Sequence, residues 1–252
     1  MSMERLQAAL RKAKSPLALG IAPTIAEVAA PLKKQFEEML GSGHLADCEA
    51  LRYHAMQLLE LASESGLAAV VIDADSFLPY GMMGADVLGN LVSAARAKEL
   101  YCIVDYRTTR PNPYLTCENA PDGVTVLPYT GGDCVPEIEG KSIFATVRTD
   151  NETGGEVQNL IAGDRPLYVA LAMQCARRGA GLVVETGYSL DVKELRRRCP
   201  SAFLMLKHCD GENATPAFDD YGHGAMVVDY TLRTAEDVEK AKKSLKEWVS
   251  IV

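Results

Sequence analysis

Short apolar runs of five to seven residues recur along the chain and alternate with longer segments in which apolar residues return every three or four positions. The short runs are rich in Val, Ile and Leu, which is typical of strands buried on both faces. We expect eight strands, at 17–21, 67–73, 101–105, 123–129, 142–148, 181–186, 202–207 and 225–229. The longer segments predict helices with one buried face, at 45–65, 83–99, 165–179, 189–198 and 234–250.

Alternating strands and helices predict the α/β class, with a parallel sheet. Eight such units close naturally into a (β/α)8 TIM barrel. A doubly wound open sheet is the alternative, but the first strand runs into GIAPT rather than a Gly-x-Gly-x-x-Gly turn. The third and fourth crossovers are shortened. Only 17 residues separate Asp105 from Gly123, with room for a short helix around 114–119, and residues 130–141 form the fourth.

Composition narrows the class of protein further. With 252 residues, 48% of them hydrophobic, we expect residues 1–252 to form a single barrel domain. The net charge is −8 and no run of Lys or Arg is present, so we expect no nucleic-acid partner. No stretch approaches the roughly 20 apolar residues of a membrane span. Together with seven scattered cysteines that suit reduced thiols, this predicts a cytoplasmic protein without membrane contact.

Charged groups gather where the predicted strands end, which in a barrel of this type is the edge that forms the active site. Seven of the eight strand ends carry an ionisable group: Asp73, Asp75, Asp105, Arg107, Tyr129, Arg148, Asp150, Glu185, Lys207, His208 and Asp229. Arg107, Arg110 and Arg148 could together bind a planar anion such as a carboxylate, because guanidinium groups offer paired donors. For Arg148 the alternative is an ion-pair lattice with Asp73, Asp75 and Asp150.

Lys207 ends an apolar strand, so burial could lower its pKa and suit it to Schiff-base formation or proton abstraction. The alternative is a structural ion pair with Glu185 or Asp229. His208 and nearby carboxylates lack the local spacing of a metal site, so we expect neither a metal nor a cofactor.

Five segments in order carry a family resemblance: SPLALGIAP (15–23), AAVVIDADSFLPYGMMG (68–84), CIVDYRTTR (102–110), VTVLPYTGGD (124–133) and SIFATVRTDNETGGEVQ (142–158). Across most of its length the chain resembles orotidine 5′-phosphate decarboxylase of the longer bacterial type. The resemblance implies a TIM barrel that acts on a phosphorylated anion, with sites at the interface of a homodimer. It also implies a network of Lys and Asp side chains in which a lysine protonates the carbon left by carbon dioxide.

The residues that would carry this chemistry depart from the family pattern. The family's Asp-x-Lys-x-x-Asp becomes Asp105-x-Arg107-x-x-Arg110, and Ala22 replaces the first-strand aspartate. A guanidinium keeps its proton and is a poor general acid. LKHCDGEN (206–213) stands in place of the phosphate loop, carboxylates follow it between 210 and 221, and Arg233 stands near the phosphate arginine. We therefore expect no efficient orotidylate decarboxylation.

The sequence leaves two hypotheses of different classes. In the first the protein is a diverged, decarboxylase-like lyase on a small anionic molecule, with Asp105, Arg107 and Lys207 in catalysis. Substrate binding is then assigned to Asp73, Arg110, Tyr129, Arg148, Glu185, Asp229 and Arg233. In the second it is a non-catalytic pseudoenzyme barrel that binds a ligand or a protein partner. A homodimer follows from the resemblance, although the shortened third crossover weakens that expectation.

Overall fold

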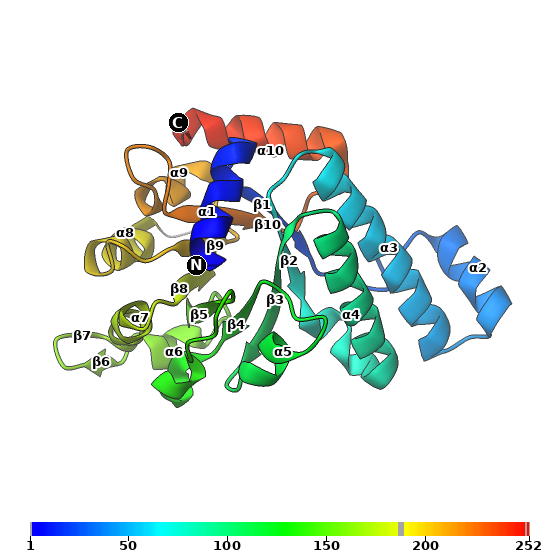
Figure 1. Ribbon diagram of the computed structural model, residues 1–252, viewed down its shortest axis with the longest axis horizontal. Coiled ribbons are helices and arrows are strands. Elements are labelled where there is room, and N and C mark those ends of the chain that lie inside the picture. The colour runs from blue at the N-terminus through cyan, green and yellow to red at the C-terminus, as the bar shows by residue number, and fades with distance from the viewer. Residues whose placement is uncertain (1, 186–188, 250, 252) are drawn as a thin grey trace.

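The predicted barrel is confirmed. A computed structural model describes residues 2–185, 189–249 and 251. Its parallel strands close in the order β1-β10-β9-β8-β5-β4-β3-β2, as the view in Figure 1 shows. The barrel strands are β1 (Leu17–Ile21), β2 (Ala69–Asp73), β3 (Tyr101–Thr108), β4 (Gly123–Val126), β5 (Ser142–Arg148), β8 (Gly181–Glu185), β9 (Leu204–Lys207) and β10 (Ala225–Asp229).

Strands β1, β5 and β10 begin and end where the apolar runs predict. Strand β3 differs, because it continues three residues beyond Asp105 to Thr108. Its pairing with β4 changes register between Val104 and Thr108. An irregularity of this kind bends a strand and re-aims the side chains that it carries. Here it lies at the carboxyl end of the strand, where charged residues were predicted.

The long amphipathic segments form helices that cover the barrel within a few residues of the predicted bounds. They are α3 (His44–Glu64), α4 (Gly81–Ala97), α7 (Leu167–Arg177), α8 (Ser189–Arg198) and α10 (Ala235–Trp248). Thr234 caps α10 in a reciprocal capping box with Asp237. The third crossover holds only α5 (Asn112–Thr116), and the fourth holds two 3₁₀ turns (Pro128–Thr130 and Gly132–Cys134). Short helices α6 (Gly154–Gln158) and α9 (Gly211–Ala214) follow β5 and β9.

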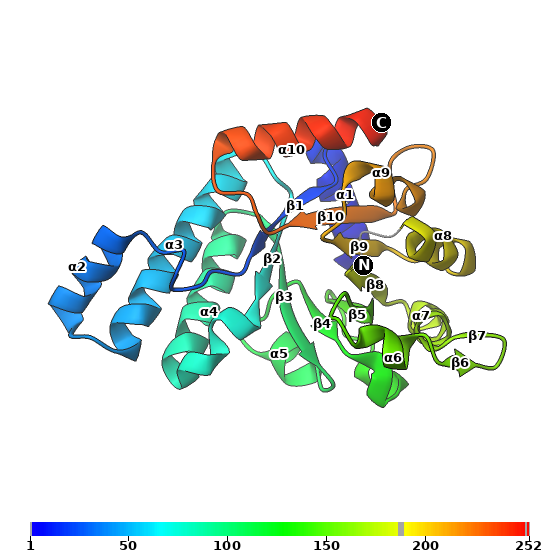
Figure 2. The ribbon, with the colours of Figure 1, turned by 180° about the vertical axis from the view of Figure 1, so that it is seen from behind.

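Three features of the fold were not predicted from the sequence. Helix α2 (Ala30–Leu40) packs on α3 and projects away from the barrel (Figure 2). A small antiparallel hairpin, β6 (Ile161–Ala162) with β7 (Arg165–Pro166), precedes α7. Helix α1 (Ser2–Ala13) lies across the amino end of the barrel, where Leu6 and Leu10 join the interior core.

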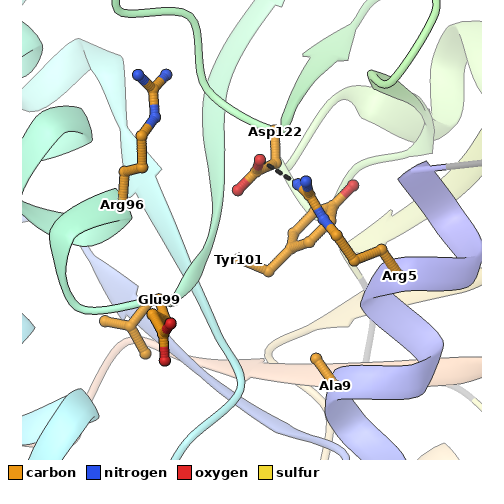
Figure 3. A pocket seen from close by; sticks show the side chains of 7 residues that line it. Arg5, Ala9, Arg96, Glu99, Tyr101 and Asp122 are labelled. Atoms are coloured by element: carbon orange, nitrogen blue, oxygen red, sulfur yellow. Dashed lines mark hydrogen bonds and ion pairs between the residues drawn. The ribbon is translucent and has the colours of Figure 1, made fainter.

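Helix α1 closes the amino end with polar contacts as well. The Ser2 hydroxyl is 2.7 Å from the hydroxyl of Tyr101, which in turn donates to Ser142 Oγ at 2.9 Å. Arg5 points to Asp122 and pairs with it beside a hollow of about 230 Å³, which Figure 3 shows from close by. The inward-facing side chains above this layer are apolar, among them Ile103, Phe144, Val183, Met205 and Met226. The next inward layer, at the carboxyl ends of the strands, is polar.

In the part of the chain that the structure describes, no helix combines the length and apolar character needed to cross a membrane.

Candidate active site

Two buried carboxylates hold one buried ammonium at the carboxyl end of the barrel. Lys207 Nζ lies 2.5 Å from Asp105 Oδ2 and 2.7 Å from Glu185 Oε1. Arg107 adds a second cation, with Nη2 3.4 Å from Asp105 Oδ2 and 3.2 Å from Glu185 Oε1. Asp105, Glu185 and Lys207 are 2%, 4% and 1% exposed, so this network is shielded from bulk water. We call these four residues the Lys207 cluster.

The Lys207 cluster bridges the interior of the barrel. Lys207 ends β9 and Asp105 lies on β3, and in the closed strand order these two strands are four steps apart in either direction. They therefore stand opposite each other, and the lysine side chain crosses the interior to reach the aspartate. Glu185 comes from β8, the neighbour of β9, in register with Lys207. The contact joins residues 102 positions apart in the sequence.

The protonation of the cluster corrects one prediction. Burial alone would lower the pKa of Lys207, as expected from the sequence, but the fields of Tyr230, Asp105 and Glu185 outweigh burial and raise it. Burial would likewise raise the pKa of Asp105, yet the charges of Lys207 and Arg107 lower it. The lysine is therefore held as ammonium and the aspartate as carboxylate. A neutral amine suited to Schiff-base formation is not what this environment favours, because Lys207 pairs with Glu185 at 2.7 Å as well as with Asp105.

Arg107 owes its position to the irregular end of β3. Its backbone lies in the left-handed region, with φ 47°, and its N–H donates to Thr125 Oγ1 at 2.9 Å. The Thr125 hydroxyl in turn donates to Asp105 Oδ1 at 2.5 Å, so one threonine fixes both residues. His208, directly after β9, also has a positive φ of 52°. Non-glycine residues in this region are strained, and such strain concentrates at functional sites.

Asp73 sits beside the cluster, paired in register with Asp105 on the neighbouring strand. Burial, followed by the charges of Asp105 and Asp75, raises the pKa of Asp73. Ser76 Oγ is 3.4 Å from its carboxylate. Asp73 therefore takes up a proton more readily than an aspartate in water does.

Other predicted residues are engaged elsewhere. Arg148 pairs with Asp191 at 3.0 Å and donates to Gln158 Oε1, so the expected lattice with Asp73, Asp75 and Asp150 is wrong. The reason is that Asp191, the first-turn carboxylate of α8, lies next to Arg148 at the end of β5. The proposed clamp of three arginines therefore loses Arg148 to a structural pair.

Tyr129 donates to the carbonyl oxygen of Val147 at 2.7 Å, which ties the turn after β4 to β5. Asp229 accepts from the backbone and side chain of Thr231, both at 2.7 Å, and it is not the partner of Lys207. Arg233 pairs with Glu27 at 2.6 Å and donates to the carbonyls of Tyr230 and Leu232. Arg110 is exposed just beyond β3, with its backbone N–H bonded to Thr108.

Thr125 and Tyr230 are two of the inward-facing residues of this edge that sequence reasoning missed. Thr125 lies in the middle of β4, and only its alternation with Val124 and Val126 indicated which face it occupies. Tyr230 follows β10, and its ring lies 5.8 Å from Lys207 Nζ. Among the described residues, no group of three or more His, Cys, Asp or Glu side chains is placed to hold a metal ion.

Comparison with known proteins agrees with this architecture. No protein-family model matches the sequence. The orotidine 5′-phosphate decarboxylase of Rhodopirellula baltica is 25% identical over 260 residues, covering 88% of this chain and 84% of that protein. That of Thermomicrobium roseum is 27% identical over 152 residues, covering 51% of this chain and 54% of its own length. These similarities support membership of the orotidine 5′-phosphate decarboxylase family.

A solved structure from Toxoplasma gondii, described as a putative orotidine-monophosphate decarboxylase, superposes with a TM-score of 0.81 over 97% of this chain and 95% of that one. Its sequence identity of 19% supports the shared fold alone. This chain thus shares the barrel of that structure. It surrounds Asp105, near the carboxyl end of β3, with side chains from β8 and β9.

Proposed function

We propose that the protein is a decarboxylase-like lyase acting on a small carboxylic acid at the Lys207 cluster, and that it is not an efficient orotidylate decarboxylase. The observation that carries the proposal is the buried contact of Lys207 Nζ with Asp105 and Glu185. It supplies a charged ammonium beside the retained aspartate, which is the pairing that the family resemblance implies. The ammonium comes from β9 instead of β3.

The proposed step breaks the bond between the carboxylate carbon and its neighbour. Carbon dioxide leaves, the electron pair stays on the neighbouring carbon, and Lys207 gives that carbon a proton from Nζ. Solvent then returns a proton to the amine. A raised lysine pKa does not prevent this transfer, because a carbanion is a far stronger base than an amine, and positioned general acids contribute about 10²–10⁴-fold.

The charges around Lys207 suit both the binding of the substrate and the loss of carbon dioxide. Arg107 attracts the anionic substrate, since about 40% of its side chain is exposed while its guanidinium touches the cluster. Asp105 is buried and ionised, so a substrate carboxylate placed against it is repelled until carbon dioxide forms. The same aspartate keeps Lys207 protonated until the carbanion develops.

Orotidylate itself fits this site poorly. Arg107 stands where the resemblance puts the proton-donating lysine, and Arg233 is already paired with Glu27. Asp210, Glu212, Asp219 and Asp220 lie in the loop after β9, where the family binds phosphate, and they would repel a phosphate dianion.

A non-catalytic barrel is the second candidate, and one observation favours it. Lys207, Asp105 and Glu185 are almost fully buried and already satisfy one another. Such a triad can serve as a purely structural ion network, with ligand or partner binding confined to the rim.

Release of carbon dioxide decides between the two. Purified protein is incubated with a panel of small carboxylic acids and with orotidylate, and carbon dioxide is measured for the wild type and for Lys207→Met. Lys141→Met is the matched control, because Lys141 is half-buried at the amino end and donates only to the carbonyls of Ala120 and Pro121. We expect turnover of at least one small acid, lost in Lys207→Met and kept in the control. In D2O the product should carry one deuterium on the carbon that lost the carboxylate.

Turnover of orotidylate above that of every small acid would refute the substrate assignment. Equal turnover by the wild type and Lys207→Met would refute the role of the lysine. Folded protein that releases no carbon dioxide from any acid would favour the non-catalytic barrel.

A further inference from the structure

Two buried hydroxyl groups at the carboxyl end of the barrel have no hydrogen-bond partner within residues 2–185, 189–249 and 251. They are the Tyr230 hydroxyl and Thr146 Oγ1, two of the four buried polar side-chain atoms that lack a partner among the described residues. Thr146 is fully buried, and it faces inward because Phe144, two positions earlier on β5, lies in the interior core. In the strand order, β10, β9, β8 and β5 are consecutive. Tyr230, Lys207, Glu185 and Thr146 therefore form one arc around the interior.

The backbone of β1 makes room for the Tyr230 ring. A Cβ added to Gly20 would lie 2.3–2.6 Å from three atoms of that ring, a distance that no side chain tolerates. His208 stacks on the ring from the direction of β9, with centroids 5.8 Å apart and planes at 22°. Gly20 on β1 thus leaves space for the tyrosine ring, and His208 after β9 stacks on it. Together they fix the ring over the interior, 5.8 Å from Lys207 Nζ.

A buried donor without a partner is costly, and proteins keep very few of them. Burial raises the pKa of Tyr230, so the hydroxyl keeps its proton and remains a donor at neutral pH. Phenylalanine would fill the same space without that cost. An unpaired hydroxyl next to a charged cluster is therefore most simply explained by a ligand group that completes it.

We infer that the Tyr230 hydroxyl binds an uncharged oxygen of the ligand, such as a keto oxygen close to its carboxylate, and that Thr146 Oγ1, on the same arc, contributes to this site. The inference rests on the proposed function in placing the ligand at the Lys207 cluster. Among the charges that act on this hydroxyl, Lys207 favours an anion, but it is already paired with two carboxylates. Asp105, Asp73 and Glu185 disfavour an anion, so a second negative charge on the ligand would be repelled by three carboxylates here. A neutral acceptor is not repelled, and a donor aimed at a keto oxygen also stabilises the charge that oxygen gains when carbon dioxide leaves.

The first test is thermal stability of the free protein. Tyr230→Phe should leave Tm unchanged or raise it, because the variant removes an unpaired polar group. Tyr129→Phe is the matched control, and its Tm should fall because it leaves the Val147 carbonyl without its donor. A fall in Tm for Tyr230→Phe as large as that of Tyr129→Phe would mean that the hydroxyl is already satisfied, by the protein or by bound water, and would overturn the inference.

The second test measures the binding of two acids that differ only in the keto oxygen, acetoacetate and butanoate, by calorimetry. The wild type should bind acetoacetate more tightly, by about 2–10-fold for one added hydrogen bond. Tyr230→Phe should bring the ratio close to one without changing the affinity for butanoate, and Thr146→Val should reduce it.

The inference is overturned if the wild type shows no preference, if it binds neither acid, or if the preference survives in Tyr230→Phe. Preference for the keto acid without carbon dioxide release from any acid would instead refute the lyase and leave this recognition site standing.

Discussion

Each end of the barrel holds a tyrosine whose hydroxyl is buried, and the two hydroxyls differ in their hydrogen bonds. At the amino end the Tyr101 hydroxyl is bonded to Ser2 and Ser142 beneath helix α1. At the carboxyl end the Tyr230 hydroxyl has no partner in the described part of the chain. The first arrangement is what stability alone favours. The second costs stability, and it lies beside a buried cluster of opposite charges, which indicates that the two ends serve different purposes.

Backbone strain follows the same division. Among the described residues, four non-glycine residues have a positive φ: Lys14, Glu99, Arg107 and His208. Lys14 and Glu99 come just after helices α1 and α4, where a left-handed residue commonly ends a helix. Arg107 and His208 stand at the carboxyl edge of β3 and β9, where no helix ends. The strain that is not explained by ordinary helix capping is therefore confined to the candidate site.

The largest expected effect comes from removing the ammonium that holds the carboxyl end together. Lys207→Met leaves Asp105 and Glu185 buried without their shared cation, and breaking a buried pair in this way costs about 3–5 kcal/mol. We expect a loss of this size in the free energy of unfolding, measured by urea denaturation. Lys141→Met, at the amino end, should lose about 1 kcal/mol. Equal losses in the two variants would contradict the special role of the Lys207 cluster.

Removal of the hydroxyl at the amino end should come next. Tyr101→Phe leaves Ser2 and Ser142 without their common partner in a buried layer, at a cost of about 1–3 kcal/mol. Tyr230→Phe is the matched change at the other end, and there we expect no loss. Comparison of the two unfolding free energies tests directly whether one end is built for stability and the other is not.

The third prediction concerns pH. The folded protein binds the Asp73 proton more tightly than the unfolded chain, whose carboxyl has an ordinary value near 3.8. The contribution of Asp73 to the free energy of unfolding therefore falls as pH rises from 3.8 through its raised pKa. Asp105 has the opposite sign, because its lowered pKa adds stability above 3.8 that is lost as pH falls.

Asp73→Asn should remove the first of these two effects and stabilise the protein above that window, by on the order of 1 kcal/mol. Unfolding curves of the wild type and Asp73→Asn between pH 3 and 8 check it. A difference between the two proteins that does not change with pH would contradict the raised pKa of Asp73.

The smallest effects are expected from relief of backbone strain. Glycine tolerates a positive φ but loses more entropy on folding, so His208→Gly and Lys14→Gly should each change stability by less than about 1 kcal/mol. Only His208→Gly should also weaken the binding of a keto acid, since it removes the ring stacked on Tyr230. An equal loss of keto-acid binding in Lys14→Gly would contradict the distinction between strain at the candidate site and a left-handed residue that ends a helix.

Local pattern predicted most of the barrel. Apolar runs located its eight strands, and a capping residue located the start of α10 at Thr234. Helix α1 was not predicted, although Leu6 and Leu10 give it an apolar face. Helix α2 buries no residue fully and therefore has little core-facing signal of its own. The predicted charges at the strand ends include every member of the Lys207 cluster.

Which of those charges meet could not be read from the sequence. Lys207 and Asp105 are 102 residues apart, and their contact depends on the closed order of the strands and on the length of the lysine side chain. The sign of the lysine pKa shift depended on that contact, since burial and a carboxylate act in opposite directions. Arg148 was predicted to bind substrate at the carboxyl end of the barrel. Its actual partner, Asp191, lies in a segment for which the sequence predicted a helix but no contact.

The route that Lys207 takes across the barrel has a consequence for how such proteins change over evolutionary time. In a closed ring of strands, a point near the axis can be reached from any strand by a long enough side chain. A charged residue can therefore be lost from one strand and gained on the strand that faces it, while the charged atoms occupy the same place near the axis. A motif defined by spacing along one strand records only the starting point of the side chain, so descendants that have changed the starting point are best sought by where the charged atoms meet.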